Sequence, residues 1–179
     1  TCFVMLFAAG ARVLHLGSLV AMSMPGAVYA MLSEPYRRKR IFAFLDPWQD
    51  PQKTGFHIIQ SLYALGSGGL FGVGLGRSRQ KFFYLPEPGT DFIFSVLGEE
   101  LGLVGASIII SLYFLLAWRG LMIALRAQDM LGAMLAVGIT TMITLQAVVN
   151  IGVVTGSLPV TGITLPFISY GGSSLVFMA

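Results

Sequence analysis

The chain has 179 residues, of which 55% are hydrophobic and 11% charged, and its mean hydropathy is +0.80. Soluble globular domains carry about 25% charged residues, so this composition points to lipid as the solvent and excludes an ordinary soluble enzyme or a disordered tail. The net charge of +3 rests on eleven basic residues, which are too few and too localised for a nucleic-acid-binding surface. The single cysteine, Cys2, excludes an internal disulfide.

The N-terminal part predicts the end of one membrane span and a complete second one. Residues 1–11 are apolar and are expected to be the tail of a span. Residues 13–33 supply the roughly 20 residues that a bilayer requires, with His15 as their only ionisable group, and Pro25 is expected to kink this helix. Because the chain does not begin with Met and stops within an apolar run, we expect it to be an internal fragment of a larger multi-pass protein.

Residues 34–90 form a long polar connection that is rich in proline, aromatic and charged residues. So many aromatic residues argue against a disordered linker. Residues 56–65 carry a helical apolar stripe that is too short to span a bilayer, so we expect an interfacial or re-entrant helix there. The glycines of residues 66–76 lack the spacing of a dinucleotide site and are expected to let the backbone approach other backbone or a ligand.

The C-terminal half predicts further helices, because no residue after Asp129 is charged and this run is too long for one pass. Thr164 is expected to cap the last helix and Pro166 to lie in its first turn. The sequence therefore predicts an all-α polytopic protein with a single membrane domain and about five transmembrane helices. The expected segments are a span, a cytoplasmic link, a span, an outer turn and the start of the last span: residues 91–118, 119–129, 130–155, 156–164 and 165–179.

Basic residues predict the orientation of these spans. Lys and Arg favour the cytoplasmic side in short loops, whereas long loops often escape this rule. Arg12 lies in one short link, and Arg119 and Arg126 lie at another two spans away. We therefore assign both links to the cytoplasm and residues 34–90 to an extracytoplasmic loop. The basic run at residues 37–40 either binds phosphate or lipid head groups there or is a solvated anchor.

Asp91 is the main acid–base candidate. The sequence holds no metal-binding cluster, P-loop or nucleophile elbow, so carboxylates are the obvious proton acceptors. A partly desolvated carboxylate at the membrane surface would have a raised pKa and would serve as a general base, and the alternative is an Asp that caps a helix. Asp91 tops a helical stripe that permits close packing or leaves a groove for a lipid tail, formed by Ser95, Gly98, Gly102 and Gly105.

Further polar residues are candidates for substrate binding. Acidic residues within a span are functional candidates. Glu99 and Glu100 lie about 80° and 180° from Asp91 around the helix, so they are not a matched pair, and a salt-bridged structural role is favoured for Glu100. Cations of the long loop suit a pyrophosphate-bearing substrate, since they offset the charge of the leaving group. The predicted binding residues are Arg77, Arg79, Lys81, Glu87, Thr90, Glu99, and, facing a cavity or another helix, Gln146 and Asn150.

Several motifs follow one another along most of the chain. They are Glu34–Arg37, Asp46–Pro51, Gly72–Gly76, Gln80–Lys81, Tyr84–Glu87, Thr90–Phe94, Gly98–Gly102 and Leu158–Ser174. In order and composition they resemble the SEDS family of shape, elongation, division and sporulation proteins, and most of all its FtsW branch. The resemblance implies a ten-span protein of the bacterial inner membrane, located at the division septum.

The resemblance also implies an activity. It is inverting glycosyltransfer that polymerises lipid II, an undecaprenyl-pyrophosphate-linked disaccharide peptide, into β-1,4 glycan strands. A class B penicillin-binding protein and other division proteins are the implied partners, beside membrane lipid and without nucleic acid. The proposed catalytic Asp of the family falls on Asp91, which favours the general base over the cap. A divalent cation, Mg²⁺ or Mn²⁺, would assist at the pyrophosphate. A flippase for the same lipid and a non-catalytic scaffold are the alternatives.

Overall fold

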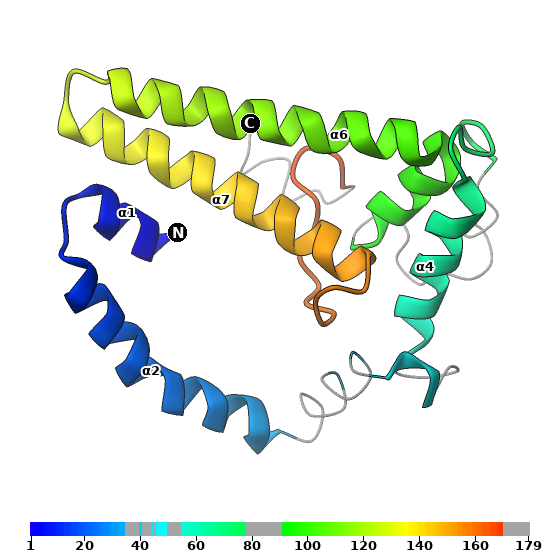
Figure 1. The fold of residues 1–179 in the computed structure, drawn as a ribbon, viewed down its shortest axis with the longest axis horizontal. Coiled ribbons are helices and arrows are strands. Elements are labelled where there is room, and N and C mark those ends of the chain that lie inside the picture. The colour runs from blue at the N-terminus through cyan, green and yellow to red at the C-terminus, as the bar shows by residue number, and fades with distance from the viewer. Residues whose placement is uncertain (35–39, 41–43, 45, 50–54, 78–90, 170–179) are drawn as a thin grey trace. The chain divides into compact units, whose positions relative to one another are not determined.

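The computed structural model describes residues 1–34, 40, 44, 46–49, 55–77 and 91–169. All regular structure in these residues is helical, which confirms the predicted all-α class (Figure 1). Among the described residues, α2, α6 and α7 are long and apolar enough to cross a membrane. The elements are α1 (Cys2–Ala8), α2 (Val13–Ser33), the 3-10 turn η1 (Pro47–Gln49), α4 (Phe56–Gly68), α6 (Ile93–Arg126) and α7 (Met130–Val154).

The chain divides into two compact units. Unit 1 comprises Thr1–Arg38 and Tyr113–Leu145, and unit 2 comprises Lys39–Leu112 and Gln146–Ala179. Unit 1 therefore holds α1, α2 and the adjoining parts of α6 and α7. Unit 2 holds α4, the first part of α6, the last part of α7 and the loop that follows. Every predicted site residue that the structure describes belongs to unit 2.

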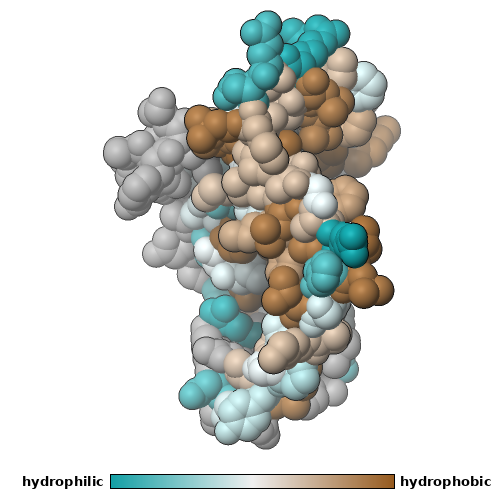
Figure 2. Space-filling view, turned by 90° about the vertical axis from the view of Figure 1, so that its left-hand side faces the viewer, coloured by the Kyte–Doolittle hydropathy of each residue, from teal (hydrophilic) through white to brown (hydrophobic). Residues whose placement is uncertain are grey.

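Glycines let the helices of unit 1 approach closely. A Cβ added at Gly120 of α6 would overlap with the side chain of Thr140 of α7, and one added at Gly138 would lie 3.1 Å from the sulfur of Met5 in α1. Small residues allow this kind of close packing between helices in a membrane. Hydrophobic side chains cover much of the face in Figure 2, and hydrophilic ones lie at its upper end and in smaller groups further down. Exposed hydrophobic side chains are expected for helices that cross lipid.

Helix α6 is longer than predicted. The sequence analysis ended this span at residue 118 and placed a link at residues 119–129, but α6 continues to Arg126. A helix can continue beyond its membrane-spanning part, since Arg is a good helix former whose long side chain reaches the membrane interface, so the predicted end of the span at residue 118 stays a prediction. The remaining link is short, and Oδ2 of Asp129 accepts a 2.7 Å hydrogen bond from the backbone N–H of Gly132, which caps the start of α7.

The helix predicted to begin at residue 165 is absent from residues 165–169. These residues form a turn, in which the N–H of Ser169 donates to the carbonyl of Leu165 at 3.0 Å and the hydroxyl of Ser169 accepts from the N–H of Leu165 at 2.7 Å. Phe167 has a φ of 63°, a left-handed conformation that an α-helix excludes. The predicted helix start and cap are therefore wrong, and residues 170–179 lie outside the described part of the chain.

In unit 2, α6 is broken at Gly102, whose φ of 68° and ψ of −169° are not helical. The break leaves backbone amides and carbonyls on both sides without partners in the helix. Residues 69–74, which follow α4, supply those partners through four hydrogen bonds. With the donor first, these are Val73 to Glu99 (3.0 Å), Gly74 to Glu100 (3.1 Å), Leu103 to Gly69 (2.9 Å) and Val104 to Leu70 (3.2 Å).

Four glycines make this close approach possible. A Cβ added at Gly68 or Gly72 would overlap with backbone of α6, one added at Gly98 with the side chain of Leu65, and one added at Gly102 with the backbone of Gly72. The prediction that the glycine-rich segment lets backbone approach backbone is therefore confirmed. The small-residue stripe of α6 packs against protein at this level, and the break at Gly102 removes Gly105 from the helical face that starts at Ser95.

Candidate functional site

Asp91 lies in a turn directly before α6 and is half-buried. The carbonyl of Phe92 accepts hydrogen bonds from the N–H groups of Ser95 and Val96, at 3.0 and 3.4 Å. Phe92 therefore occupies the N-cap position of α6, and Asp91 precedes it by one residue. This geometry disfavours the alternative in which Asp91 is the capping residue. The carboxylate lies outside the helix and is only partly buried.

Asn150 of α7 holds the backbone at Asp91 in place. Its side chain is 1% exposed, and its Nδ2 donates to the carbonyl of Asp91 at 2.8 Å and to the carbonyl of Ile163 at 2.7 Å. Its Oδ1 is buried and has no hydrogen-bond partner among the described residues. Asn150 was predicted to bind substrate. Its observed contacts are those of a positioning residue, because they tie the turn at Asp91 to the loop after α7.

Replacing Asn150 by Ala is expected to lower the free energy of unfolding by roughly 2 kcal/mol, because two backbone carbonyls lose the same buried donor. Denaturation of the full-length protein in detergent measures this change. Gln146 lies one turn earlier in α7 and makes no hydrogen bond with the described residues, so Gln146→Ala is the matched control and should cost less than about 1 kcal/mol. Equal losses in the two variants would contradict the positioning role.

The loop after α7 passes beside the carboxylate of Asp91. A Cβ added at Gly162 would lie 3.4 Å from Oδ2 of Asp91, and Gly162 has a φ of +70°, a backbone conformation that favours glycine. Nη1 of Arg40 donates to the carbonyl of Val160 in the same loop at 3.1 Å. Arg40 is half-buried, so this member of the predicted basic run is neither a solvated anchor nor free of protein contacts. Residues 37–39 lie outside the described residues.

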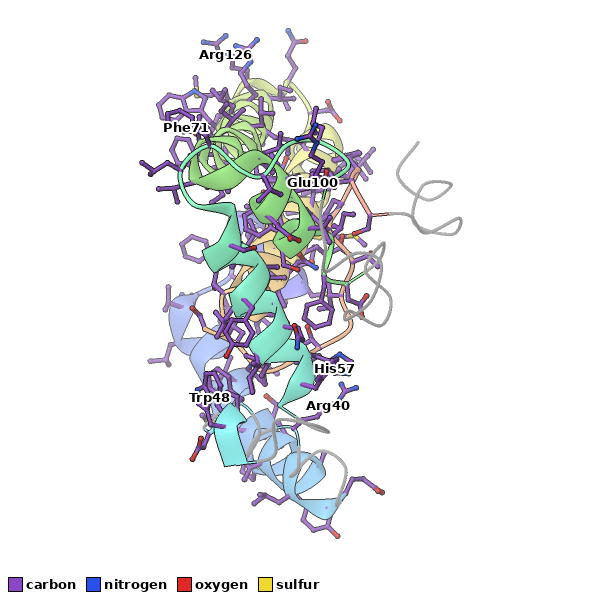
Figure 3. All side chains as sticks on the ribbon, turned by 90° about the vertical axis from the view of Figure 1, so that its right-hand side faces the viewer. Arg40, Trp48, His57, Phe71, Glu100 and Arg126 are labelled. Carbon is purple, nitrogen blue, oxygen red and sulfur yellow. The ribbon has the colours of Figure 1, made fainter. Side chains whose placement is uncertain are left out.

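His57 is a residue near Asp91 that the sequence analysis missed. Its ring stacks on the ring of Phe92, with the centroids 5.8 Å apart and the planes inclined by 16°. Burial, and to a lesser degree the positive charge of Arg40, lowers the pKa of His57 below its ordinary value of 6.5. Figure 3 shows Arg40 and His57 together at the start of α4. A single histidine in a long loop carries no sequence signal that would pair it with the residue after Asp91.

The lowered pKa of His57 predicts a loss of stability in mild acid. Below pH 6.5 the unfolded chain binds a proton at this histidine, whereas the folded protein resists protonation until the pH reaches its lower pKa. The contribution to the free energy of unfolding is therefore complete above pH 6.5 and decreases as the pH falls through the folded pKa. Melting temperatures of the full-length protein between pH 5 and 8 should show this slope, and His57→Phe should reduce it. An unchanged slope in His57→Phe would contradict the assignment.

A cavity of unit 2 brings two predicted binding residues together. Its volume is about 520 Å³, and it is lined by Ser67, Val73, Arg77 and Glu99. Glu99 is 2% exposed, whereas Arg77 is exposed at the end of the glycine-rich segment. A cation from the long loop and an acid from α6 therefore share one cavity, although their positions in the sequence are well separated.

The remaining predicted residues divide into two groups. Glu100 and Gln146 each have a buried side-chain oxygen with no hydrogen-bond partner in the described part of the chain, so no described residue pairs with Oε1 of Glu100 in the salt bridge expected for it. The other predicted residues, Arg79, Lys81, Glu87 and Thr90, lie outside the described residues.

Within the residues that the structure describes, no three His, Cys, Asp or Glu side chains are grouped to hold a metal ion, so these residues do not themselves fit the expected divalent cation.

Comparison with known proteins covers the whole chain. A family model described as "Cell cycle protein", for FtsW, RodA and SpoVE proteins, matches residues 1–179. Stage V sporulation protein E of Bacillus subtilis (strain 168) is 61% identical over 178 residues, which cover 99% of this chain and 49% of that protein. A probable peptidoglycan glycosyltransferase FtsW of Geobacter sp. (strain M18) is 54% identical over 173 residues, which cover 97% of this chain and 47% of that protein.

A solved structure shares the fold. It is described as "Structural coordination of polymerization and crosslinking by a peptidoglycan synthase complex", and it matches with a TM-score of 0.73 and 37% identity over 97% of this chain and 48% of that one. The chain thus spans about half the length of the curated relatives that it matches. The family match over residues 1–179 agrees with the presence, among the described residues, of helices that are able to span a membrane. The chain is part of a multi-pass membrane protein and belongs to the FtsW, RodA and SpoVE family of cell cycle proteins.

Proposed function

We propose that the full-length protein is a peptidoglycan glycosyltransferase that polymerises lipid II, with Asp91 as its general base. The observation that carries this proposal is the placement of Asp91: a half-buried carboxylate outside the helix, on a backbone held by Asn150. Membership of the family supports the activity, as do the names of the FtsW relatives and the description of the solved complex.

The chemistry is a single displacement. Asp91 accepts the proton of the acceptor's 4-hydroxyl group while that oxygen attacks the anomeric carbon of the donor sugar. The new carbon–oxygen bond forms as the bond to pyrophosphate breaks, and the polyprenyl pyrophosphate leaves with the bonding electrons. Attack from the opposite face converts the α-linked donor into a β-linked product. The proton then passes from Asp91 to water, which restores the base for the next cycle.

The leaving pyrophosphate needs positive charge near it. Arg77 is our candidate from the described residues, with Arg79 and Lys81 as further candidates, because all three lie on the chain between the glycine-rich segment and Asp91. Glu99 shares the cavity of Arg77, where it would orient the guanidinium group or a sugar hydroxyl. We assign Glu87, Thr90 and Gln146 to substrate binding on their sequence positions alone.

The finer role that we propose is septal cell-wall synthesis beside a class B penicillin-binding protein, in the bacterial inner membrane. The names of the FtsW relatives support this role, whereas 61% identity to the sporulation relative favours spore-wall synthesis as the second candidate. The location of the labelled full-length protein in its host cell distinguishes the two roles. A septal enzyme gathers at mid-cell in every dividing cell, whereas a sporulation enzyme gathers only in cells that form spores.

The test of the activity uses the full-length protein, purified in detergent or in vesicles and supplied with labelled lipid II. Glycan polymer of increasing length is the expected product. A flippase would instead move the lipid across the bilayer without making polymer. A scaffold would do neither, even with its penicillin-binding partner present. Either of the last two results would overturn the proposed function.

A further inference from the structure

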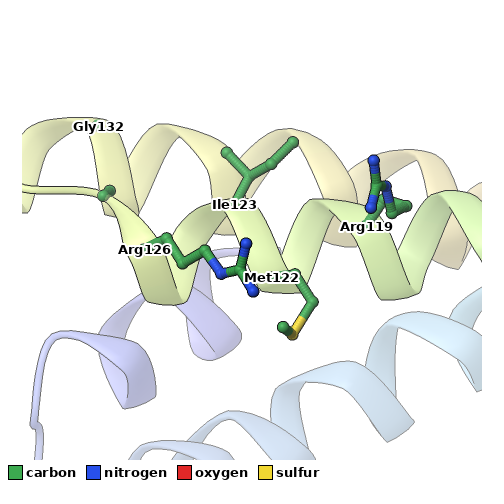
Figure 4. Close-up of a pocket in the computed structure, with 6 residues that line it drawn as sticks. Arg119, Met122, Ile123, Arg126 and Gly132 are labelled. Atoms are coloured by element: carbon green, nitrogen blue, oxygen red, sulfur yellow. The ribbon is translucent and has the colours of Figure 1, made fainter.

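Unit 1 contains a cavity at the turn between α6 and α7, and no residue of it belongs to the site at Asp91. Its volume is about 430 Å³. Figure 4 shows two arginines of α6 at this cavity, one near the turn and one further along the helix. We refer to it as the arginine groove. It is lined by Arg119, Met122, Ile123, Arg126, Ala127 and Gly132.

The spacing of the α6 residues in the arginine groove puts them on one helix face. Met122, Ile123 and Arg126 follow Arg119 by three, four and seven residues, and such positions line one side of an α-helix. The two arginine Cα atoms are therefore roughly 10 Å apart along the axis, with two apolar side chains between them. A face of this kind offers charge at both ends and a hydrophobic middle.

The charges of the arginine groove are not neutralised by the described residues. Neither Arg119 nor Arg126 makes a hydrogen bond or ion pair with any described residue. The acid of the adjacent link, Asp129, uses Oδ2 to cap α7 at Gly132. The groove therefore holds two cations, and the carboxylate of the adjacent link already has a hydrogen-bond partner, which leaves the groove with excess positive charge.

The surroundings of the arginine groove are apolar. Leu125 is 81% exposed and Leu131 is 73% exposed, on helices that are long and apolar enough to span a membrane. Arginines near the end of such a helix extend their guanidinium groups to the head-group layer. The guanidinium fork binds phosphate oxygens in pairs, and basic pockets between spans on the cytoplasmic side suit anionic lipid head groups.

We propose that the arginine groove binds an anionic glycerophospholipid. Arg119 and Arg126 contact its phosphate oxygens, and Met122 and Ile123 contact its acyl chains. The predicted orientation places this lipid in the cytoplasmic leaflet, because Arg12 lies in one short link and Arg119 and Arg126 lie in the part of α6 that leads into another. A lipid fits better than a soluble anion, since the apolar side chains between the two cations need an apolar ligand. This binding is independent of the glycosyltransfer at Asp91.

The experiment measures lipid binding to the full-length protein in detergent by native mass spectrometry. Phosphatidylglycerol and phosphatidylcholine with identical chains are titrated in parallel. The wild-type protein is expected to retain phosphatidylglycerol at least tenfold more tightly than phosphatidylcholine. The double variant Arg119→Gln with Arg126→Gln is expected to lose that preference, and circular dichroism shows whether it is folded. Single variants are expected to fall between the two.

Two controls separate this site from general attraction between charges. Arg12→Gln removes one exposed cation from the other short link and should leave the lipid preference unchanged. Glycerol phosphate, which carries the head group without chains, should not displace the lipid at equal concentration. The proposal is overturned if the folded double variant keeps the preference, if Arg12→Gln lowers binding as much as Arg119→Gln or Arg126→Gln does, or if glycerol phosphate competes as well as the lipid.

Discussion

Asp91→Asn in the full-length protein is expected to lower the rate of glycan polymerisation by about 10² to 10⁴-fold, the usual contribution of a general base. The amide has nearly the same shape as the carboxylate but does not accept the proton of the attacking hydroxyl. Since the bond from Asn150 reaches the main-chain carbonyl of Asp91, the substitution leaves that contact in place. We expect kcat to fall while lipid II binding changes little.

The matched control is Asp129→Asn. Asp129 is an exposed carboxylate of unit 1 that caps α7, and Asn caps helices about as well as Asp, so this variant should keep wild-type activity and stability. The assay follows polymer length from labelled lipid II, with lipid movement across vesicles measured in parallel. Polymerisation at the wild-type rate by Asp91→Asn would remove Asp91 from the chemistry, and polymer loss in both variants would show a defect that is not specific to Asp91.

Gly102→Ala is expected to lower the free energy of unfolding of the full-length protein by about 3 kcal/mol or more. Its φ of 68° and ψ of −169° lie in a region that is open almost only to glycine, and a side chain there costs about 1 to 3 kcal/mol. An added Cβ would also overlap with the backbone of Gly72, and such overpacking costs about 1 to 3 kcal/mol more. The break in α6 would have to move, and its four bonds to residues 69–74 would be disturbed.

Gly66→Ala is the matched control for this prediction. Gly66 lies within α4, and a Cβ added there meets nothing within 4 Å. The same substitution in a helix interior should be neutral or stabilise by up to about 1 kcal/mol. Denaturation of both variants in detergent measures the difference. A Gly102→Ala protein as stable as Gly66→Ala would show that the bonded break in α6 contributes little to the fold.

Local pattern was sufficient to predict the helices. Apolar runs of bilayer length predicted α2 and α7, and a short stripe predicted α4, which the structure extends to Gly68. Boundaries set by tertiary contacts were predicted less well. The break at Gly102 follows from hydrogen bonds to a segment roughly thirty residues away along the chain. A glycine within a span does not by itself predict such a break. The turn at residues 165–169 depends on a hydrogen bond between the side chain of Ser169 and the backbone of Leu165.

The candidate site was predicted in part. Asp91 was selected because an acid beside a span is unusual, and Arg77 and Glu99 were selected by charge. Their shared cavity is a fact of the tertiary structure. Residues that act through backbone or ring contacts carried no such signal. Arg40 was one cation in a run, and His57 was a single histidine in a long loop.

The sequence by itself determined that the chain is helical, crosses a membrane and carries a candidate acid where its long loop meets a span. These properties depend on the hydropathy, helical periodicity and charge of residues that are close together in the sequence. Only the tertiary structure decided which distant groups meet that acid: the amide of Asn150, the backbone of Gly162 and, through Phe92, the ring of His57. The physical reason is that hydrogen bonds and ring stacking act over a few ångströms in space, whatever the separation along the chain.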